Sequence, residues 1–202
     1  MDLEMPEAPG ISEKDSEVLG KIEEEALSNF TFDGIRRLTR YHPETLSRSL
    51  LRLEAEGLLV RTPEGYSVRA HGTSGQRGVA LKQTRIPLLH TILPYDLDPD
   101  TVARFLAGRW FDRLRWVGIS NGLGEVVLKW VTDDGGAQID AVLRRGELDI
   151  EARVQDERDL DSAVKASHQL VTKILKFYSS EGAGKRMAYP IRDAGTGSPS
   201  AM

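Results

Sequence analysis

Arginine side chains are the most promising chemical groups in this sequence, and they are concentrated in one segment. Residues 31–80 contain eight Arg, no Lys and five acidic residues, whereas residues 1–30 contain nine acidic residues and two Lys. A guanidinium group is planar and carries five donors, so it suits forked contacts with phosphate and with guanine. The segment therefore favours contact with nucleic acid, although the net charge of the 202-residue chain is −4. Solvated arginines on helix surfaces are the alternative explanation of the same pattern.

Three short helices are expected in this part of the chain, and the second and third carry five of these arginines: Arg36, Arg37, Arg40, Arg48 and Arg52. Ser12 and Asp15 mark the start of a first helix, which we expect to run to about Ser28. Thr31 caps a second helix. Pro43 begins a third, because proline fits the first position of a helix but disfavours helix in the residue before it.

The third helix, PETLSRSLLRLEAEG, is the most informative part of the chain. Leu46, Leu50 and Leu53 recur at i, i+4 and i+7 and predict one buried stripe. The residues that lie away from this stripe are Glu44, Arg48, Leu51, Arg52 and Ala55. After this helix, the ranges 58–61 and 66–69 predict a short β-hairpin.

The segment IRRLTRYHPETLSRSLLRLEAEGLLVRTPEGYSV, from Ile35 to Val68, thus combines a helix, a turn, a second helix and a hairpin. Residues 16–70 resemble the winged helix-turn-helix domain of archaeal or bacterial transcription regulators of the MarR, ArsR and Lrp type. In such proteins the third helix enters the major groove, and the wing touches the adjacent minor groove or backbone. The resemblance places on the base-reading face Thr45, Ser47, Arg48 and Arg52, the two arginines being the main readers. It places near phosphates or beside the wing Arg36, Arg37, Arg40, His42, Arg61 and Arg69.

Three features depart from the usual DNA-binding pattern. Leu51 stands where such domains often carry a polar or basic residue, and Glu44 would repel phosphate unless it accepts from a cytosine amino group. The wing tip, Pro63-Glu64-Gly65, has no Arg or Lys. These features favour an alternative function, that of a non-catalytic adaptor whose winged helix binds protein.

The second half of the chain predicts a separate α+β unit over residues 81–179. Three Gly and few apolar residues in 71–80 indicate a linker before it. Strands and helices are expected in the order β-α-β-β-β-β-α. The expected strands are 86–93, 113–120, 124–132, 137–144 and 147–154. One helix is expected to begin at Pro99, and the last helix to span 160–179. The expected fold is therefore α+β, with a winged helix-turn-helix domain at 12–70 followed by a sheet-and-helix sandwich.

Alternation along the strands predicts an antiparallel sheet with one face buried and one face in water. Val126, Leu128 and Trp130 share the buried face. The side chains expected in water are Lys129, Asp140, Arg144, Asp149, Glu151 and Arg153. The last helix is expected to cover the buried face with Val164, Leu170, Val171, Ile174, Leu175 and Tyr178, and it could also form a homodimer.

Three tryptophans are the candidates for a small-molecule pocket in this half: Trp110, which is expected to point inward, Trp116 and Trp130. Core packing is the commoner role of such residues. No pattern predicts a catalytic group, a cofactor or a metal site. The chain has no Cys, and Asp96, Asp98 and Asp100 lack the Gly and Glu that a calcium loop needs.

The sequence as a whole predicts a dimeric transcription regulator that binds double-stranded DNA. Its second domain would dimerise, bind a small-molecule effector, or both. No apolar run is long enough to cross a membrane and no signal peptide is recognisable, so we expect a cytoplasmic protein. Residues 1–11 and 180–202 are expected to be a flexible acidic leader and a flexible tail. An enzyme that uses a cavity of the second domain ranks below the adaptor, because no residue supplies its catalytic group.

Overall fold

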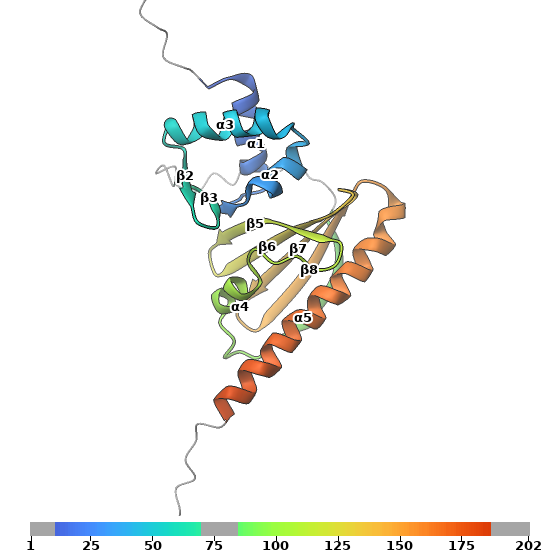
Figure 1. Cartoon of the computed structure of the whole chain (residues 1–202). Coiled ribbons are helices and arrows are strands. Elements are labelled where there is room, and N and C mark those ends of the chain that lie inside the picture. The colour runs from blue at the N-terminus through green and yellow to red at the C-terminus, as the bar shows by residue number, and fades with distance from the viewer. Residues whose placement is uncertain (1–10, 70–84, 187–202) are drawn as a thin grey trace, which may run out of the picture.

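The computed structural model describes residues 11–69 and 85–186, and their fold is α+β (Figure 1). The first part contains α1 (Glu13–Glu24), β1 (Asn29–Phe30), α2 (Phe32–Thr39), α3 (Pro43–Ala55), β2 (Leu59–Thr62) and β3 (Gly65–Val68). The second part contains β4 (Ile86–Ile92), α4 (Pro99–Leu106), β5 (Leu114–Gly122), β6 (Glu125–Thr132), β7 (Ala137–Arg144), β8 (Glu147–Val154), the 3₁₀ turn η1 (Glu157–Asp159) and α5 (Leu160–Arg186). The predicted β-α-β-β-β-β-α order of the second part is confirmed.

Local side-chain caps explain where the first helices begin. Ser12 and Asp15 form a reciprocal capping box at the start of α1, and the Thr31 hydroxyl accepts the Gly34 N–H at the start of α2. Pro43 is the first residue of α3, as predicted. The first helix ends at Glu24 rather than near Ser28, because the chain turns there and then enters β1.

The last helix is longer than predicted, and its predicted buried face is confirmed at Leu170, Val171 and Ile174 only. It continues past Ser179 to Arg186, so residues 180–186 are helical and do not belong to a tail. Its buried stripe consists of Ala163, Ala166, Leu170, Ile174 and Phe177. Val164 and Leu175, expected on the buried side, are exposed because they lie off this stripe. The side chain of Tyr178, the predicted linker at 71–80, residues 1–10 of the leader and 187–202 of the tail lie outside the described part of the structure.

A single antiparallel sheet of eight strands joins the two parts of the chain, in the order β2-β3-β1-β5-β6-β7-β8-β4. The two-residue strand β1, which the sequence analysis did not predict, makes the connection by pairing with both β3 and β5. It pairs Phe30 with Gly118 of β5. A side chain at Gly118 would place its Cβ 2.3 Å from the backbone oxygen of Asn29, so only glycine permits this approach. The two predicted domains therefore share one sheet.

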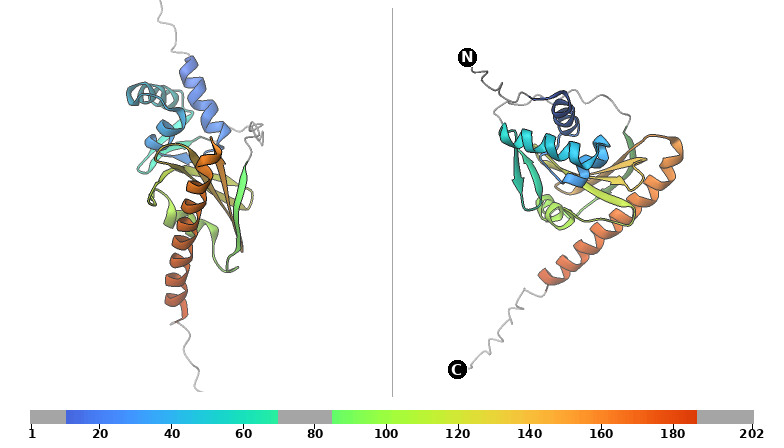
Figure 2. Two further views of the ribbon diagram at one scale, coloured as in Figure 1. Left: turned by 90° about the vertical axis from the view of Figure 1, so that its right-hand side faces the viewer. Right: turned by 45° about the horizontal axis from the view of Figure 1, so that its top comes forward.

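Helices pack on both faces of this sheet and create two apolar cores (Figures 1 and 2). On one face, α4 and α5 cover Leu128, Trp130 and the other residues predicted to be buried there. On the opposite face, α1, α2 and α3 pack over Val117 and Val131. The prediction that this second face lies in water is wrong over its centre, where Lys129 is 3% exposed and Asp140 is 2% exposed.

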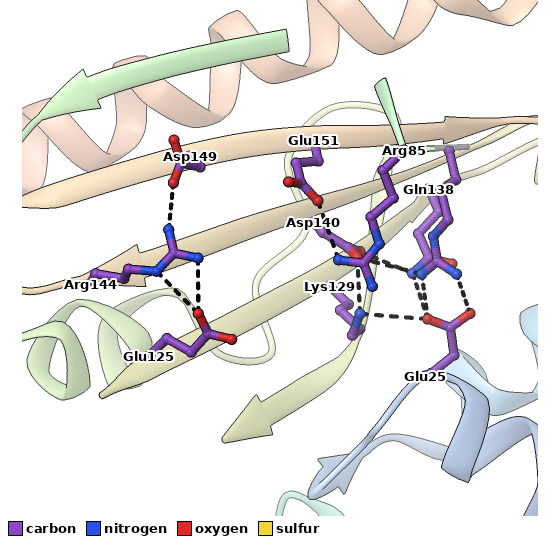
Figure 3. A network of polar contacts seen from close by, with 10 residues as sticks. Glu25, Arg85, Glu125, Lys129, Gln138, Asp140, Arg144, Asp149 and Glu151 are labelled. Atoms are coloured by element: carbon purple, nitrogen blue, oxygen red, sulfur yellow. Dashed lines mark hydrogen bonds and ion pairs between the residues drawn. The ribbon is translucent and has the colours of Figure 1, made fainter. Parts of the chain in front are cut away.

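A cluster of charged side chains fills the centre of that second face (Figure 3). Glu25, which follows α1, is buried against the sheet and receives hydrogen bonds from both Nη atoms of Arg153 and from Nε2 of Gln138. Lys129 Nζ lies 2.9 Å from Asp140 Oδ2 and 3.5 Å from Glu25 Oε2. Two carboxylates therefore face two cations, and the cluster has no net charge. Such compensation allows charged groups to be buried together.

The pKa of Glu25 depends on two opposing effects in this cluster, burial and the neighbouring cations. Burial alone would raise the pKa, but the hydrogen bonds and positive charge of Arg153, with the charge of Lys129, lower it from 4.5 to about 2. The ionised form of Glu25 is thus strongly preferred in the folded protein.

Replacement of Glu25 by Gln should destabilise the fold in a pH-dependent manner. At neutral pH we expect a loss of about 3 kcal/mol, because two cations remain buried with one carboxylate. Since the pKa of Glu25 is lowered to about 2, its ionisation stabilises the folded protein above about pH 5, and this contribution disappears as the pH falls toward 2. Urea unfolding of both proteins at several pH values, followed by tryptophan fluorescence, would measure the difference.

Glu24→Gln is the matched control, because Glu24 lies one residue earlier and pairs with the half-buried Lys21. We expect it to have a much smaller effect. The same loss of stability with decreasing pH in wild type and in Glu25→Gln would contradict the role of Glu25.

Candidate functional site

Helix α3 lies on the side of the molecule away from α5 (Figure 1), and one of its faces is open. Leu46, Leu50 and Leu53 are fully buried, as the apolar stripe predicted. The opposite face exposes Ser47 and Arg48, together with Leu51, which is 56% exposed. Among the residues that the structure describes, no element covers this face, which we call the α3 face.

Two predicted contact residues at the start of α3 have defined local roles. The exposed His42 caps the helix, since its Nδ1 accepts the N–H of Glu44 at 3.4 Å. Glu44 also accepts from Arg48, one turn further along, and both side chains are exposed. An exposed pair of this kind contributes little free energy. Arg48 can therefore exchange Glu44 for another anion at small cost. Thr45, the remaining predicted reader of this turn, is half-buried.

Arg52, predicted to be a main reader of bases, is engaged with α1 instead. Its Nε and one Nη each lie 2.7 Å from an oxygen of Asp15, which is fully buried. The Arg52 hydrogen bond, which outweighs the effect of burial, holds the pKa of Asp15 well below its usual range. Forked pairing with a buried carboxylate fixes the position of both side chains. Arg52 thus fastens α3 to α1.

The arginines of α2 face the sheet rather than the α3 face. Arg36 forms a pair with Asp33 of its own helix, and Arg40 donates to Gln155 Oε1 at 3.1 Å, just after β8. Arg37 and Arg40 also line a cleft of about 550 Å³ between α1, α2 and the sheet. We call this the α2–sheet cleft, and its charged and amide lining is Lys21, Glu25, Arg37, Arg40, Gln138, Arg153 and Gln155. The structure therefore separates the predicted phosphate contacts of α2 from those of α3.

The hairpin that follows α3 carries the last two predicted contacts. Arg61 on β2 and Arg69 after β3 are both exposed. The structure thus brings together, on α3 and the adjoining hairpin, the exposed residues Ser47, Arg48, Arg61 and Arg69.

The three tryptophans do not line one pocket. Trp130 is fully buried in the core, where its indole N–H donates to the backbone oxygen of Arg109. Trp116 packs edge-on against Trp130. Trp110, predicted to point inward, is 59% exposed because it follows the end of α4 and lies beside Arg115. The three tryptophans therefore do not share a pocket, although Trp110 and Trp116 each line a separate one.

The described residues offer neither a metal site nor a membrane-spanning helix. They contain no group of three or more His, Asp or Glu side chains placed to hold a metal ion. No helix in the described ranges combines the length and the apolar character needed to cross a membrane.

Replacement of Arg52 by Met should destabilise the protein more than replacement of Arg48 by Met. The first change leaves the buried carboxylate of Asp15 without its forked partner, whereas the second breaks only an exposed pair. We expect the thermal midpoint to fall by several degrees for Arg52→Met and to remain close to wild type for Arg48→Met. Differential scanning calorimetry would show this. Equal midpoints for the two variants would mean that the Arg52 pair does not hold α1 and α3 together.

Comparison with known proteins adds no relative: no protein-family model, no curated protein and no solved structure matches this chain.

Proposed function

We propose that this protein is a transcription regulator that binds double-stranded DNA through a winged helix-turn-helix. The observation that carries the proposal is the open α3 face beside a hairpin with two exposed arginines. Helix, helix, helix and hairpin follow one another in the order α1, α2, α3, β2, β3, as in such domains. A helix with a free polar face can enter the major groove, while the hairpin contacts the neighbouring backbone.

The geometry supports a different division of work among the arginines from the one expected from sequence. Arg48 is the main reader, with Ser47 and Thr45 beside it. Arg61 and Arg69 contact the phosphate backbone. Arg52 positions α3 through Asp15 and does not reach the bases. Arg37 and Arg40 are not part of the DNA surface, because they line the α2–sheet cleft.

A homodimer fits this proposal. Dimeric regulators present two reading helices to half-sites about one helical turn of DNA apart. The long helix α5 has exposed apolar side chains off its buried stripe, Val164 and Leu175, which a second copy could cover. No catalytic step is proposed.

The second candidate function is a protein-binding adaptor that uses the same α3 face. Leu51, at 56% exposed, lies one turn after Arg48 on this face, and Glu44 partly neutralises Arg48. An exposed leucine contacts either the methyl group of thymine or an apolar side chain of a partner. The measurement below separates the two functions.

DNA binding should depend on Arg48 and on salt. With a labelled random-sequence duplex, we expect the full chain to bind with a dissociation constant of roughly 10⁻⁴–10⁻⁶ M. Its logarithm should change linearly with the logarithm of the salt concentration. Arg48→Met should weaken binding and lower the salt slope by about 1, if the side chain contacts one phosphate in non-specific complexes. Fluorescence anisotropy across a salt series measures both quantities.

Arg104→Met is the control, because Arg104 is an exposed arginine on α4, which packs on the opposite face of the sheet. It should bind DNA like wild type. If wild type fails to bind even at low salt, DNA binding is refuted and the adaptor becomes the better proposal. If both variants weaken binding equally, the contact is not on α3.

A further inference from the structure

The α2–sheet cleft contains buried hydrogen-bond donors that the described structure leaves without acceptors. Nε of Arg37 and Nε of Arg153 are both shielded from solvent and have no hydrogen-bond partner. Both side chains line the cleft, Arg37 from α2 and Arg153 from β8. Buried polar atoms are nearly always paired in folded proteins, and an unpaired donor on a charged group is costly. The Nε atoms are as closed to a ligand as they are to water, so a ligand would contact Arg37 through its Nη atoms, for which the described residues provide no acceptor either.

The charge of the lining indicates the same kind of ligand. Four cationic side chains, Lys21, Arg37, Arg40 and Arg153, line the cleft together with one carboxylate, that of Glu25. Glu25 is already bound by Lys129 and Gln138 (Figure 3). It is also bound by Arg153. It therefore does not compensate Arg37 and Arg40. Of the two, Arg40 has a neutral partner, Gln155, and Arg37 forms no ion pair with any described residue.

Arg40 also marks the C-terminal end of α2. Arg40 ends α2 in the left-handed conformation, with φ 57°, which is unfavourable for a residue with a side chain. This conformation accompanies the placement of its guanidinium beside Gln155 and the β6–β7 turn, within reach of Gly135.

We propose that the α2–sheet cleft binds a small anionic molecule through a carboxylate or phosphate group that accepts hydrogen bonds from Arg37. Arg40 supplies further positive charge, whereas Lys21 is already paired with Glu24 and Arg153 with Glu25. The side-chain amides of Gln138 and Gln155 offer polar contacts to the rest of the molecule. The volume of about 550 Å³ lies within the usual range of about 300–1,000 Å³ for small-molecule sites. It exceeds what a single inorganic ion would fill. This inference does not rest on DNA binding by the α3 face.

Isothermal titration calorimetry with two probes tests the proposal and distinguishes the two anion classes. Citrate represents carboxylates and pyrophosphate represents phosphates, each titrated into the full chain at constant ionic strength set with sodium chloride. We expect saturable binding of at least one probe. Arg37→Met should weaken that binding by about tenfold or more, the effect of losing one or more charge-assisted hydrogen bonds. Binding of one probe alone supports the proposal and identifies the class of anion.

Stability measurements exclude a trivial loss of binding through misfolding. Because Nε of Arg37 has no partner, Arg37→Met should have an unchanged or higher thermal midpoint in the absence of anions. A lower midpoint would show that the guanidinium is already satisfied and would overturn the proposal. So would the absence of saturable binding of either probe to wild type, or equal binding by wild type and Arg37→Met.

Arg48→Met is the matched control, since it removes one arginine from the α3 face and leaves the cleft intact. It should bind the probe like wild type, while Arg37→Met should bind DNA like wild type when no anion is present. The two variants therefore distinguish failure of the cleft proposal from failure of the DNA-binding proposal.

Discussion

Burial of Glu25 is the constraint on which the rest of this structure depends. A carboxylate can lie between a helix and a sheet only if cations and hydrogen-bond donors come with it. Lys129, Arg153 and Gln138 meet that requirement from three neighbouring strands, with Asp140 balancing the second positive charge. This arrangement fixes the end of α1 over the sheet. The position of α1 in turn fixes α3, through the forked contact between Asp15 and Arg52.

Features determined by neighbouring residues were predictable from the sequence. The caps at Ser12 and Thr31 and the proline at the start of α3 are local signals, and the apolar alternation in β6, β7 and β8 correctly identified one buried face. Features that depend on distant contacts were not predictable. No local signal in the two-residue strand β1 indicates that it joins β3 to β5. One signal was available for the charge cluster, since Lys129 and Asp140 are opposite charges on adjacent strands of the predicted meander.

The arginines of the candidate site also show that features set by distant contacts are not predictable from the sequence. Composition and helical spacing identified the residues, but the partners of each one determine its role. Arg52 has a buried carboxylate within reach, Arg37 lies over a cleft, and Arg48 has only an exposed partner. These three environments produce a structural contact, a candidate ligand contact and a candidate surface contact. The sequence alone does not distinguish these three roles, because they depend on where Asp15 and the sheet lie relative to each arginine.

The position of β1 also determines when the protein can complete its fold during synthesis. Phe30 pairs with Gly118, and the core beneath α1, α2 and α3 includes Val117 and Val131. A ribosome delivers the N-terminal helices and their hairpin well before it delivers β5 and β6. Until those strands emerge, the nascent helices lack the sheet residues that complete their core. Glu25 likewise lacks its cationic partners. The first part of the chain therefore cannot complete its core before the second part has been synthesised. The two parts acquire their final stability together.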